Sequence, residues 1–337
     1  MHRDDPHRRL AESVGEVLRE AGMAQEECKA LLGLLPRKWE RFSDVVLLPS
    51  SAFRGEWGTH CSDGLWRAVA DALNAERVAR LGEIDGVMRE SSAEMLLGED
   101  DWVVRRESGV DYGYNITQCM FSAGNVNERR RMGEVAGAGE TVLDLYAGIG
   151  YYSLPMLIHS QIEHVHCCEW NPNAVRALEV NLQRNGVAGR STVHLGDNRV
   201  NAASLEGLAD RVLLGLLPSS EEGYEVAIRS LSSEGGYLHV HGVAPAKDHA
   251  SWAAGVVDSL GSVEQGRCID ADPAIRVKSY APHWDHVVLD VSVSSPAVEL
   301  KASGPSPQAW PAIGCWKPPP CTTSSRLRAG TDTRLTS

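Results

Sequence analysis

The chain has 337 residues, of which 43% are hydrophobic and 23% are charged, and its formal net charge is −12. This composition is typical of a folded protein and excludes a chain that is disordered throughout. No apolar run reaches the roughly 18 residues that a membrane-spanning helix needs, and the first residues lack the apolar stretch of a secretory signal. We therefore expect a cytoplasmic protein with no membrane contact.

The negative charge argues against nucleic-acid binding unless a local basic patch supplies the contact, because Lys and Arg grip the phosphate backbone. The chain also contains eight cysteines, without a Cys-x-x-Cys pair among Cys28 to Cys268. Such spacings do not fit a zinc site, so we expect no metal. Cys167 and Cys168 lie in a predicted strand, where cysteine behaves as a small hydrophobic residue.

Helical and strand-like patterns alternate in the first third of the chain. Residues 7–34 carry apolar side chains at helical spacing, and residues 45–48 form a short apolar run typical of a strand. Residues 62–80 predict an amphipathic helix, with Ser62 or Asp63 as its N-cap. These elements, with the strand-like runs that follow, predict a small α+β domain.

The second half alternates strands with helices. One helix is expected to end near Leu157, and another to run from Asn173 to Asn185, where Gly186 supplies a left-handed residue. Strands that alternate with helices at this spacing predict an α/β fold with a parallel sheet covered on both faces. The predicted strands are 102–104 and 112–116 in the small domain, then 141–145, 165–168, 192–195, 211–217, 236–241 and 286–291.

Beyond residue 294 the sequence is rich in Pro, Ser and Thr, which predicts a disordered tail. The predicted organisation thus has four parts. They are a helical segment at 1–36, the small α+β domain at 37–134, a Rossmann-like domain at 135–294 and the tail at 295–337.

A glycine loop, Asp144-Leu145-Tyr146-Ala147-Gly148-Ile149-Gly150, joins a predicted strand to a helix. Such a loop lets a ligand approach the backbone and uses the helix N-terminus as a positive pole, although a G-x-G pattern alone also fits a plain tight turn. The third glycine that cradles a pyrophosphate is absent, and Tyr152-Ser153 occupy that stretch. This favours S-adenosylmethionine (SAM) over NAD.

Polar residues at the ends of three strands support a SAM pocket within residues 141–200. Glu169 is placed to accept hydrogen bonds from ribose hydroxyls. Asp197 and Asn198 are placed to hydrogen-bond the adenine. Asp144 can meet the cationic amino end of SAM, with a strand-end cap as the alternative. The loop residues predicted to line the pocket are Tyr146, Gly148 and Gly150.

Seven stretches in chain order resemble those of a known family, the tRNA wybutosine-synthesising protein that acts second in its pathway. The resemblance runs from about residue 40 to about residue 292 and implies a class I SAM-dependent methyltransferase-like fold with a smaller N-terminal domain. It also implies transfer of the 3-amino-3-carboxypropyl group of SAM to the tricyclic wybutosine precursor beside the anticodon of tRNA(Phe), with release of methylthioadenosine. The stretches are 47–51, 117–125, 144–150, 166–172, 196–199, 216–222 and 277–282.

The resemblance implies SAM contacts at Ser122, Arg129, Glu169, Asp197 and Asn198. Glu169, Asp197 and Asn198 are also predicted from the strand ends, whereas Ser122 and Arg129 follow from the resemblance alone. A lysine is common in the family at the position of Arg129; arginine keeps the charge and changes the donor geometry. A hydroxyl and a basic side chain just before the Rossmann strand suit the SAM carboxylate.

Related enzymes that methylate N1 of the same guanosine carry an Asn-Leu-Pro motif after the fourth strand. Here the matching stretch is 215–222, with Gly215 or Leu216 in place of the asparagine. This favours aminocarboxypropyl transfer over two alternatives, a tRNA guanine-N1 methyltransferase and an inactive SAM- and tRNA-binding protein.

No catalytic base can be assigned from the sequence. Glu221 and Glu222 are candidates, or else they begin a helix, where carboxylates favour the dipole. His239 and His241 alternate on one strand, where a histidine more often caps the core than catalyses. Lys278, Tyr280 and His283 either contact RNA or order a loop. The catalytic candidates from the stretch after the fourth strand are Ser219, Ser220 and Glu221.

The expected partner is the anticodon stem-loop of tRNA(Phe), bound by a monomeric protein mainly through residues 37–134. Each basic cluster is also compatible with an ordinary solvated surface. The clusters are Arg37-Lys38 with Arg41, Arg105-Arg106, and Arg129-Arg130-Arg131.

Overall fold

The structure is a computed structural model that describes residues 5–82, 84–85, 90–264 and 266–295. The predicted tail therefore lies outside the described residues, apart from its first residue. Within the described ranges, every helix is too short or too polar to cross a membrane.

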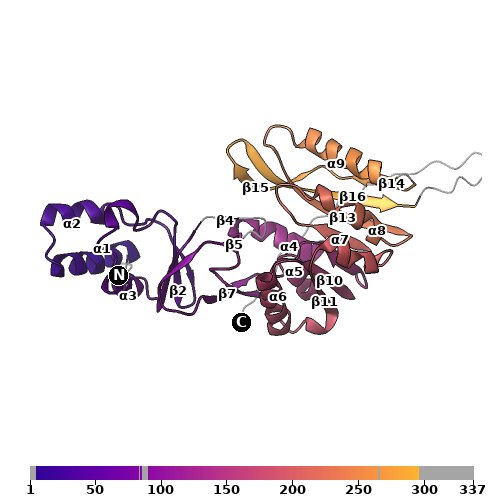
Figure 1. The fold of residues 1–337 in the computed structure, drawn as a ribbon. Coiled ribbons are helices and arrows are strands. Elements are labelled where there is room, and N and C mark those ends of the chain that lie inside the picture. The colour runs from indigo at the N-terminus through magenta and orange to yellow at the C-terminus, as the bar shows by residue number, and fades with distance from the viewer. Residues whose placement is uncertain (1–4, 83, 86–89, 265, 296–337) are drawn as a thin grey trace, which may run out of the picture. The chain divides into compact units, whose positions relative to one another are not determined.

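The N-terminal part is built on a four-stranded sheet of order β1-β2-β3-β6 (Figure 1). The helix predicted over residues 7–34 is divided in two, because Gly22 adopts a positive φ of 80° and ends the first helix. Both helices pack into one core with β2 and α3. The elements are α1 (Pro6–Glu20), α2 (Gln25–Leu32), β1 (Glu40–Phe42), β2 (Val45–Leu48), α3 (Asp63–Ala72), β3 (Arg77–Arg80), β4 (Ile84–Asp85), β5 (Glu90–Ser91) and β6 (Glu94–Leu97).

The helix predicted over residues 62–80 is wrong in extent. Helix α3 ends at Ala72, and Asn74 turns the chain with a φ of 52°. Residues 77–80 instead form β3, which lies between β2 and β6 in the sheet. Most side chains of β3 are buried. The N-cap is confirmed at Ser62, whose hydroxyl accepts a backbone N–H at 3.3 Å.

A β-hairpin of β7 (Trp102–Glu107) and β8 (Val110–Asn115) confirms the two strands predicted there. The hairpin is tied to the following domain by Asn181. Its Oδ1 accepts the Gly113 N–H at 2.6 Å, and its Nδ2 donates to the carbonyls of Gly113 and Ile149 at 3.0 Å each. One buried amide thus joins the hairpin to the glycine loop.

The large sheet has the order β11-β10-β9-β12-β13-β16-β14, with β15 paired to β16 (Figure 1). The five strands β9, β10, β11, β12 and β13 pair in parallel, as predicted. Strand β16 departs from the predicted parallel sheet, because it is antiparallel to β13, β14 and β15. The short turn that joins β15 to β16 permits only antiparallel pairing of those two strands. The strands are β9 (Thr141–Asp144), β10 (His164–Glu169), β11 (Ser191–Leu195), β12 (Arg211–Leu214), β13 (Gly235–Pro245), β14 (Cys268–Ala271), β15 (Ile275–Ala281) and β16 (Trp284–Ser294).

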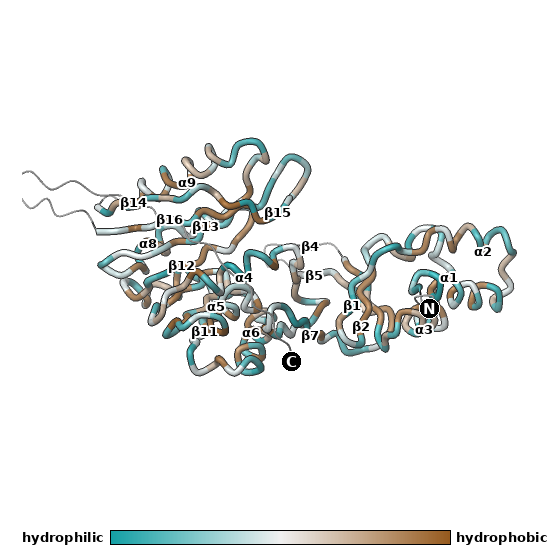
Figure 2. Tube along the Cα trace, turned by 180° about the vertical axis from the view of Figure 1, so that it is seen from behind, coloured by the Kyte–Doolittle hydropathy of each residue, from teal (hydrophilic) through white to brown (hydrophobic). Residues whose placement is uncertain are grey.

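Two hydrophobic cores lie on the opposite faces of this sheet, as expected for helices on both sides. Cys167 faces the core shared with α5 and α6, and Cys168 faces the core shared with α8 and α9. Figure 2 shows hydrophobic segments following the strands. The helices are α4 (Val126–Val135), α5 (Ser153–His159), α6 (Pro172–Arg184), α7 (Asn198–Asn201), α8 (Tyr224–Ser230) and α9 (His249–Val263).

Candidate functional site

The glycine loop follows β9 and needs glycine at two positions for different reasons. Gly148 has a φ of 56°, a conformation that residues with a Cβ rarely adopt. Gly150 has a φ of 97°, and a Cβ there would lie 2.7 Å from the Leu154 side chain. The first glycine shapes the loop, and the second lets the loop pack closely on α5.

Glu169 lies at the end of β10, where its carboxylate is fixed against the glycine loop. One oxygen accepts the Gly148 N–H at 2.8 Å, and the other accepts the Asn171 N–H at 2.8 Å. Burial raises the pKa of Glu169. Because each carboxylate oxygen has two lone pairs, both oxygens can also accept a hydroxyl. The arrangement suits a ribose hydroxyl held beside the loop.

The end of β11 approaches the same loop through Asn198. Its Nδ2 donates to the Leu145 carbonyl at 2.8 Å, and its side chain also hydrogen-bonds Tyr146. Asp197 caps α7 by accepting the Arg199 N–H, and its ion pair with the Arg199 guanidinium lowers the pKa of Asp197. The structure therefore brings the ends of β9, β10 and β11 together, as the sequence predicts.

Asp144 is completely buried at the end of β9. Its carboxylate accepts a hydrogen bond from the Ser153 hydroxyl at 2.7 Å and one from the Tyr146 N–H at 3.2 Å. Burial raises the pKa of Asp144 to about 6. These bonds form the strand-end cap that the sequence left as the alternative, and a contact with the amino end of SAM stays a prediction.

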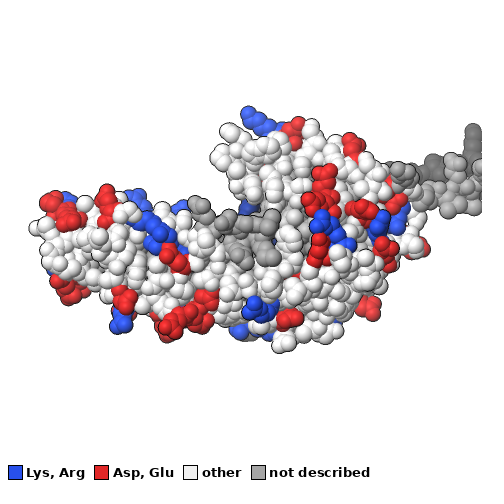
Figure 3. Space-filling model, in the orientation of Figure 1, with Lys and Arg blue, Asp and Glu red and all other residues white. Residues whose placement is uncertain are grey.

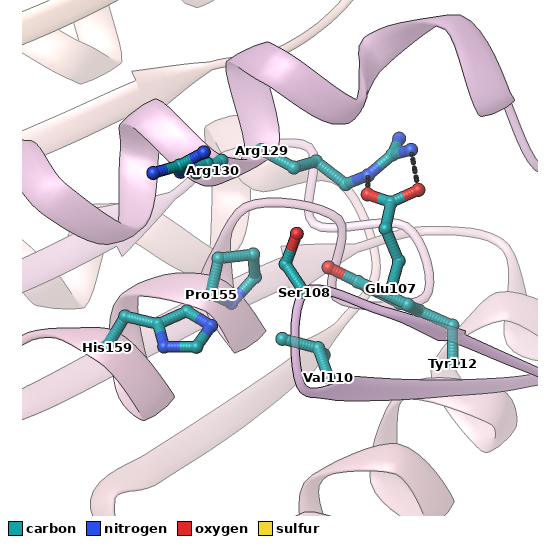
Figure 4. Close-up of a pocket in the computed structure, with 8 residues that line it drawn as sticks. All are labelled: Glu107, Ser108, Val110, Tyr112, Arg129, Arg130, Pro155 and His159. Atoms are coloured by element: carbon teal, nitrogen blue, oxygen red, sulfur yellow. Dashed lines mark hydrogen bonds and ion pairs between the residues drawn. The ribbon is translucent and has the colours of Figure 1, made fainter.

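Arg129 is held by groups of the protein, and its predicted contact with SAM stays a prediction. Only 2% of its surface is exposed, and its guanidinium donates to both oxygens of Glu107 at 2.6 and 2.7 Å. Figure 4 shows the two groups facing each other, while Arg130 points away from them. A third bond, from Nη1 of Arg129 to the Ser122 carbonyl, measures 2.9 Å. Arg129 thus holds the backbone of Ser122, and the Glu107 carboxylate balances the charge of Arg129.

Sequence reasoning missed Glu107. It lies 22 residues before Arg129 in a different element, the β7–β8 hairpin, and no local pattern connects the two. The only hint would have come from extending the predicted strand 102–104 to Glu107, whose carboxylate then lies at the strand end.

The stretch after β12 carries the three catalytic candidates and supports the helix-start alternative for one of them, Glu221. Glu221 begins a short helical turn, and its N–H is capped by the Ser219 hydroxyl at 3.2 Å. Ser220 is buried, and its hydroxyl lies 3.5 Å from the His241 carbonyl. A catalytic role for these residues stays a prediction.

The two histidines of β13 are both buried. His239 lies between the Arg211 guanidinium and the Asp290 carboxylate at 2.6 Å from each, within a network that also includes Arg131. His241 stacks on Tyr152, with ring centroids 4.9 Å apart. His239 therefore belongs to the core, whereas His241 lies at the carboxyl edge of the sheet beside the glycine loop. In the described part of the chain, no group of three or more potential ligands could hold a metal ion.

Two of the predicted basic clusters are largely internal ion pairs. Arg105 pairs with Glu40 at 3.0 Å and stacks over Phe121. Arg131 donates to Glu128 and to Asp290. These arginines do not form the free basic surface that the sequence suggested.

A smaller basic surface remains. In the Arg129-Arg130-Arg131 run only Arg130 is exposed, and Arg106 is exposed beside Asp111. The other cluster consists of three exposed residues, Arg37, Lys38 and Arg41. The face drawn in Figure 3 shows acidic and basic side chains interspersed.

Comparisons with known proteins agree with this architecture. Residues 18–101 match the TYW2 N-terminal domain, and residues 103–254 match the TRM5/TYW2 methyltransferase domain. The crystal structure of P. horikoshii TYW2 in complex with MeSAdo superposes with a TM-score of 0.69 at 30% identity, covering 84% of this chain and 99% of that one. The predicted Rossmann-like methyltransferase fold is confirmed.

Relatives from plants and animals are similar over most of the chain. The tRNA wybutosine-synthesizing protein 2/3/4 of Arabidopsis thaliana is 41% identical over 291 residues, which cover 85% of this chain but only 29% of the relative. The tRNA wybutosine-synthesizing protein 2 homolog of Danio rerio is 38% identical over 85% of this chain and 78% of its own length. The chain belongs to the tRNA wybutosine-synthesizing protein 2 family.

Proposed function

We propose that the chain transfers the 3-amino-3-carboxypropyl group of SAM to the tricyclic wybutosine precursor next to the anticodon of tRNA(Phe). Family membership supports this activity, as do the relatives named for wybutosine synthesis. The single observation that carries it is the joint presence of that family's N-terminal domain and an intact glycine loop with Glu169 and Asn198 placed beside it.

SAM fits these residues as the co-substrate. Glu169 would hold the ribose, Asp197 and Asn198 the adenine, and the segment around Ser122 the amino-acid end. SAM supplies an electrophilic γ-carbon. A carbon of the precursor ring bonds to it while the bond from the γ-carbon to sulfur breaks, and sulfur keeps the electron pair. Methylthioadenosine then leaves, and the ring loses a proton. The protein selects that carbon by orienting SAM towards the precursor, and such orientation can lower a reaction barrier by several kcal/mol.

The stretch after β12 argues against the guanine-N1 methyltransferase. A Cβ at Gly215 would lie 3.1 Å from the Tyr152 ring, so a side chain there would crowd the ring that stacks on His241. The next residue, Leu216, is apolar. An amide that orients a guanine edge is therefore missing from both positions.

The exposed cluster of Arg37, Lys38 and Arg41 is the best supported contact for the anticodon stem-loop, because none of the three forms an ion pair with another described residue. A monomeric state and a cytoplasmic location complete the proposal.

Product identification tests this function. Purified protein is incubated with SAM labelled in the aminocarboxypropyl group and with tRNA(Phe) that carries the precursor. The proposal requires methylthioadenosine and labelled tRNA. Formation of S-adenosylhomocysteine instead would establish methyl transfer, and SAM binding without either product would establish an inactive binding protein.

A further inference from the structure

Two aromatic side chains face solvent at the tip of the β15–β16 hairpin, at one end of the large sheet (Figure 1). Tyr280 and Trp284 are each 46% exposed, although a tryptophan is highly buried on average. Among the described residues, no other aromatic ring contacts either of them, and neither the Tyr280 hydroxyl nor the Trp284 indole N–H is hydrogen-bonded. The fold therefore leaves both rings available to a ligand.

The hairpin turn keeps the two rings close together. Ala281 pairs with Trp284, and Pro282 and His283 lie between them. The φ of His283 is 68°, and a proline followed by a residue of positive φ is the pattern of a type II turn. Because proline fixes its own φ, the turn presents Tyr280 and Trp284 from a short and restrained segment.

The pleat of β16 determines the face of the sheet to which Trp284 belongs. The pairing of β16 with β13 is unbroken over 11 residues, so its side chains alternate regularly between the two faces. The Asp285 carboxylate lies 3.1 Å from Nε2 of His249 on α9, so Asp285 points to the α9 face. Trp284 and His286 therefore point to the opposite face.

The opposite face is the one that carries the glycine loop. Nε2 of His286 lies 3.0 Å from Nδ1 of His241, whose ring stacks on Tyr152 beside that loop. Residues two apart on a strand are separated by about 7 Å. Trp284 thus lies at the rim of the proposed SAM site, one step outward from His286 along the strand.

The surroundings of the two rings favour RNA over a protein partner. Residues 273–284 contain no Asp or Glu, although the chain as a whole has a net charge of −12. The next carboxylate, Asp285, is paired with Arg276 at 2.8 Å on the α9 face. Ser279 and His283 are polar and exposed beside the rings, so the rings do not extend into a continuous apolar patch of the kind that marks a protein interface. Separate exposed rings without nearby carboxylates are typical of surfaces on which the bases of single-stranded RNA stack.

We propose that Trp284 and Tyr280 form a stacking platform for unpaired bases of the anticodon loop at the mouth of the SAM site. A duplex keeps its bases stacked inside, whereas a loop can present the flat face of a base to an aromatic ring. The platform thus selects loop nucleotides through ring contacts that carry no charge. The inference deepens the proposed function and rests on it, because it names the part of the RNA that this end of the sheet contacts.

Filter binding of two RNA probes by the full chain tests this assignment. One probe is the anticodon stem-loop of tRNA(Phe), and the other is a blunt duplex of the same stem without the loop. For Trp284→Ala we expect the stem-loop affinity to fall about 5- to 100-fold, as for loss of one base–aromatic stack. The duplex affinity should change less than about twofold. The salt dependence of stem-loop binding should keep its slope, because no charge has been removed.

Further variants sharpen the result. Trp284→Phe keeps an aromatic face and should recover most of the stem-loop affinity, and Tyr280→Ala should weaken stem-loop binding in the same selective way. Tyr237→Ala is the matched control, because it removes a ring that is 48% exposed on β13 of the same sheet, and it should change neither RNA affinity. Titration of SAM into Trp284→Ala should give the wild-type affinity within about twofold, which reports an intact pocket. An unchanged stem-loop affinity in Trp284→Ala, or equal losses for stem-loop and duplex, would overturn the assignment.

The outcome is separable from that of the proposed function. If wild-type protein makes S-adenosylhomocysteine, aminocarboxypropyl transfer fails, yet a selective loss of stem-loop affinity in Trp284→Ala still supports the stacking platform. If methylthioadenosine forms and Trp284→Ala binds the stem-loop as the wild type does, only the platform fails.

Discussion

Glu107 and Arg129 form a buried ion pair with two short hydrogen bonds, which joins the β7–β8 hairpin to helix α4. Because Arg129 is almost fully enclosed, Glu107→Gln leaves its charge without a counter-ion. We expect the free energy of unfolding to fall by about 3–5 kcal/mol, the usual cost of breaking one side of a buried pair. Urea unfolding followed by circular dichroism measures this loss.

The matched control is Glu134→Gln on the same helix, because the Arg130–Glu134 pair is exposed. It should cost less than about 0.5 kcal/mol. Similar costs for the two variants would contradict the importance given to the Glu107–Arg129 pair.

Replacing Gly150 with alanine should destabilise the protein. The new Cβ meets Leu154 at 2.7 Å and Leu178 at 3.0 Å, and the positive φ adds strain. A loss of about 1–3 kcal/mol follows from overpacking and backbone strain. Gly189→Ala is the control, since no atom lies within 4 Å of its Cβ. Thermal melts of both variants check the difference, and an unchanged melting temperature in Gly150→Ala would refute it.

Glu169→Gln should weaken SAM binding. The Glu169 carboxylate accepts a backbone N–H bond at each of its two oxygens, from Gly148 and from Asn171. A glutamine amide has only one acceptor oxygen, so one of these two N–H groups would face the NH₂ group instead. We expect about a 10- to 100-fold loss of SAM affinity by titration calorimetry. Glu163→Gln, an exposed carboxylate before the same strand, should bind as the wild type does. Equal affinities for both variants would remove Glu169 from the site.

Stability should fall as the solution becomes acidic, in part through His241. Burial, reinforced by neighbouring His286, His239 and Arg131, lowers the pKa of His241 well below its ordinary value of 6.5. The folded protein keeps this imidazole neutral, while the unfolded chain binds a proton below about pH 6.5. The contribution of His241 to stability is therefore fully present above that pH and is lost as the pH falls below it.

His241→Gln cannot take up that proton. Its free energy of unfolding should therefore decline less between pH 7 and pH 5 than that of the wild type, measured by urea unfolding at several pH values. A decline equal to that of the wild type would show that other groups govern the acid response.

Removing the exposed basic cluster should weaken RNA binding. Arg37→Ala with Lys38→Ala removes two of the charges proposed to contact phosphates, so we expect a lower tRNA affinity and a dependence on salt that is flatter by roughly two units of slope. Arg176→Ala with Lys247→Ala removes two exposed charges outside the cluster and serves as the control in the same filter-binding assay. Charge reversal at Arg105 is a poor test, because its pair with Glu40 would be lost as well. Matching slopes for the two double variants would place the RNA elsewhere.

Local patterns predict much of this fold. The strand, glycine loop and helix around Gly148 follow from residues that are neighbours in sequence, and Glu169 and Asn198 follow from the rule that parallel strands present their ends at one edge. The extent of α3 does not follow. Residues 77–80 carry helix-compatible apolar spacing, and only pairing with β2 makes them a strand.

The interior ion pairs lie beyond such reasoning. Arg105, Arg129 and Arg131 look like surface charges in the sequence, because arginine is rarely buried unless paired. Their partners come from other elements, 65, 22 and 159 residues away respectively. Side-chain pairing over such separations is decided by the tertiary fold, so a basic run in the sequence did not amount to a basic surface.

The position of β16 between β13 and β14 has a consequence for synthesis on the ribosome. Among the described residues, the last strand to be made is β16, an interior strand that pairs along 11 residues of β13. Until residue 294 has emerged, β13 remains an open edge, and open edges recruit strands from other chains. A nascent or prematurely terminated chain is therefore the form most exposed to aggregation, and completion of the final hairpin closes the sheet on that side.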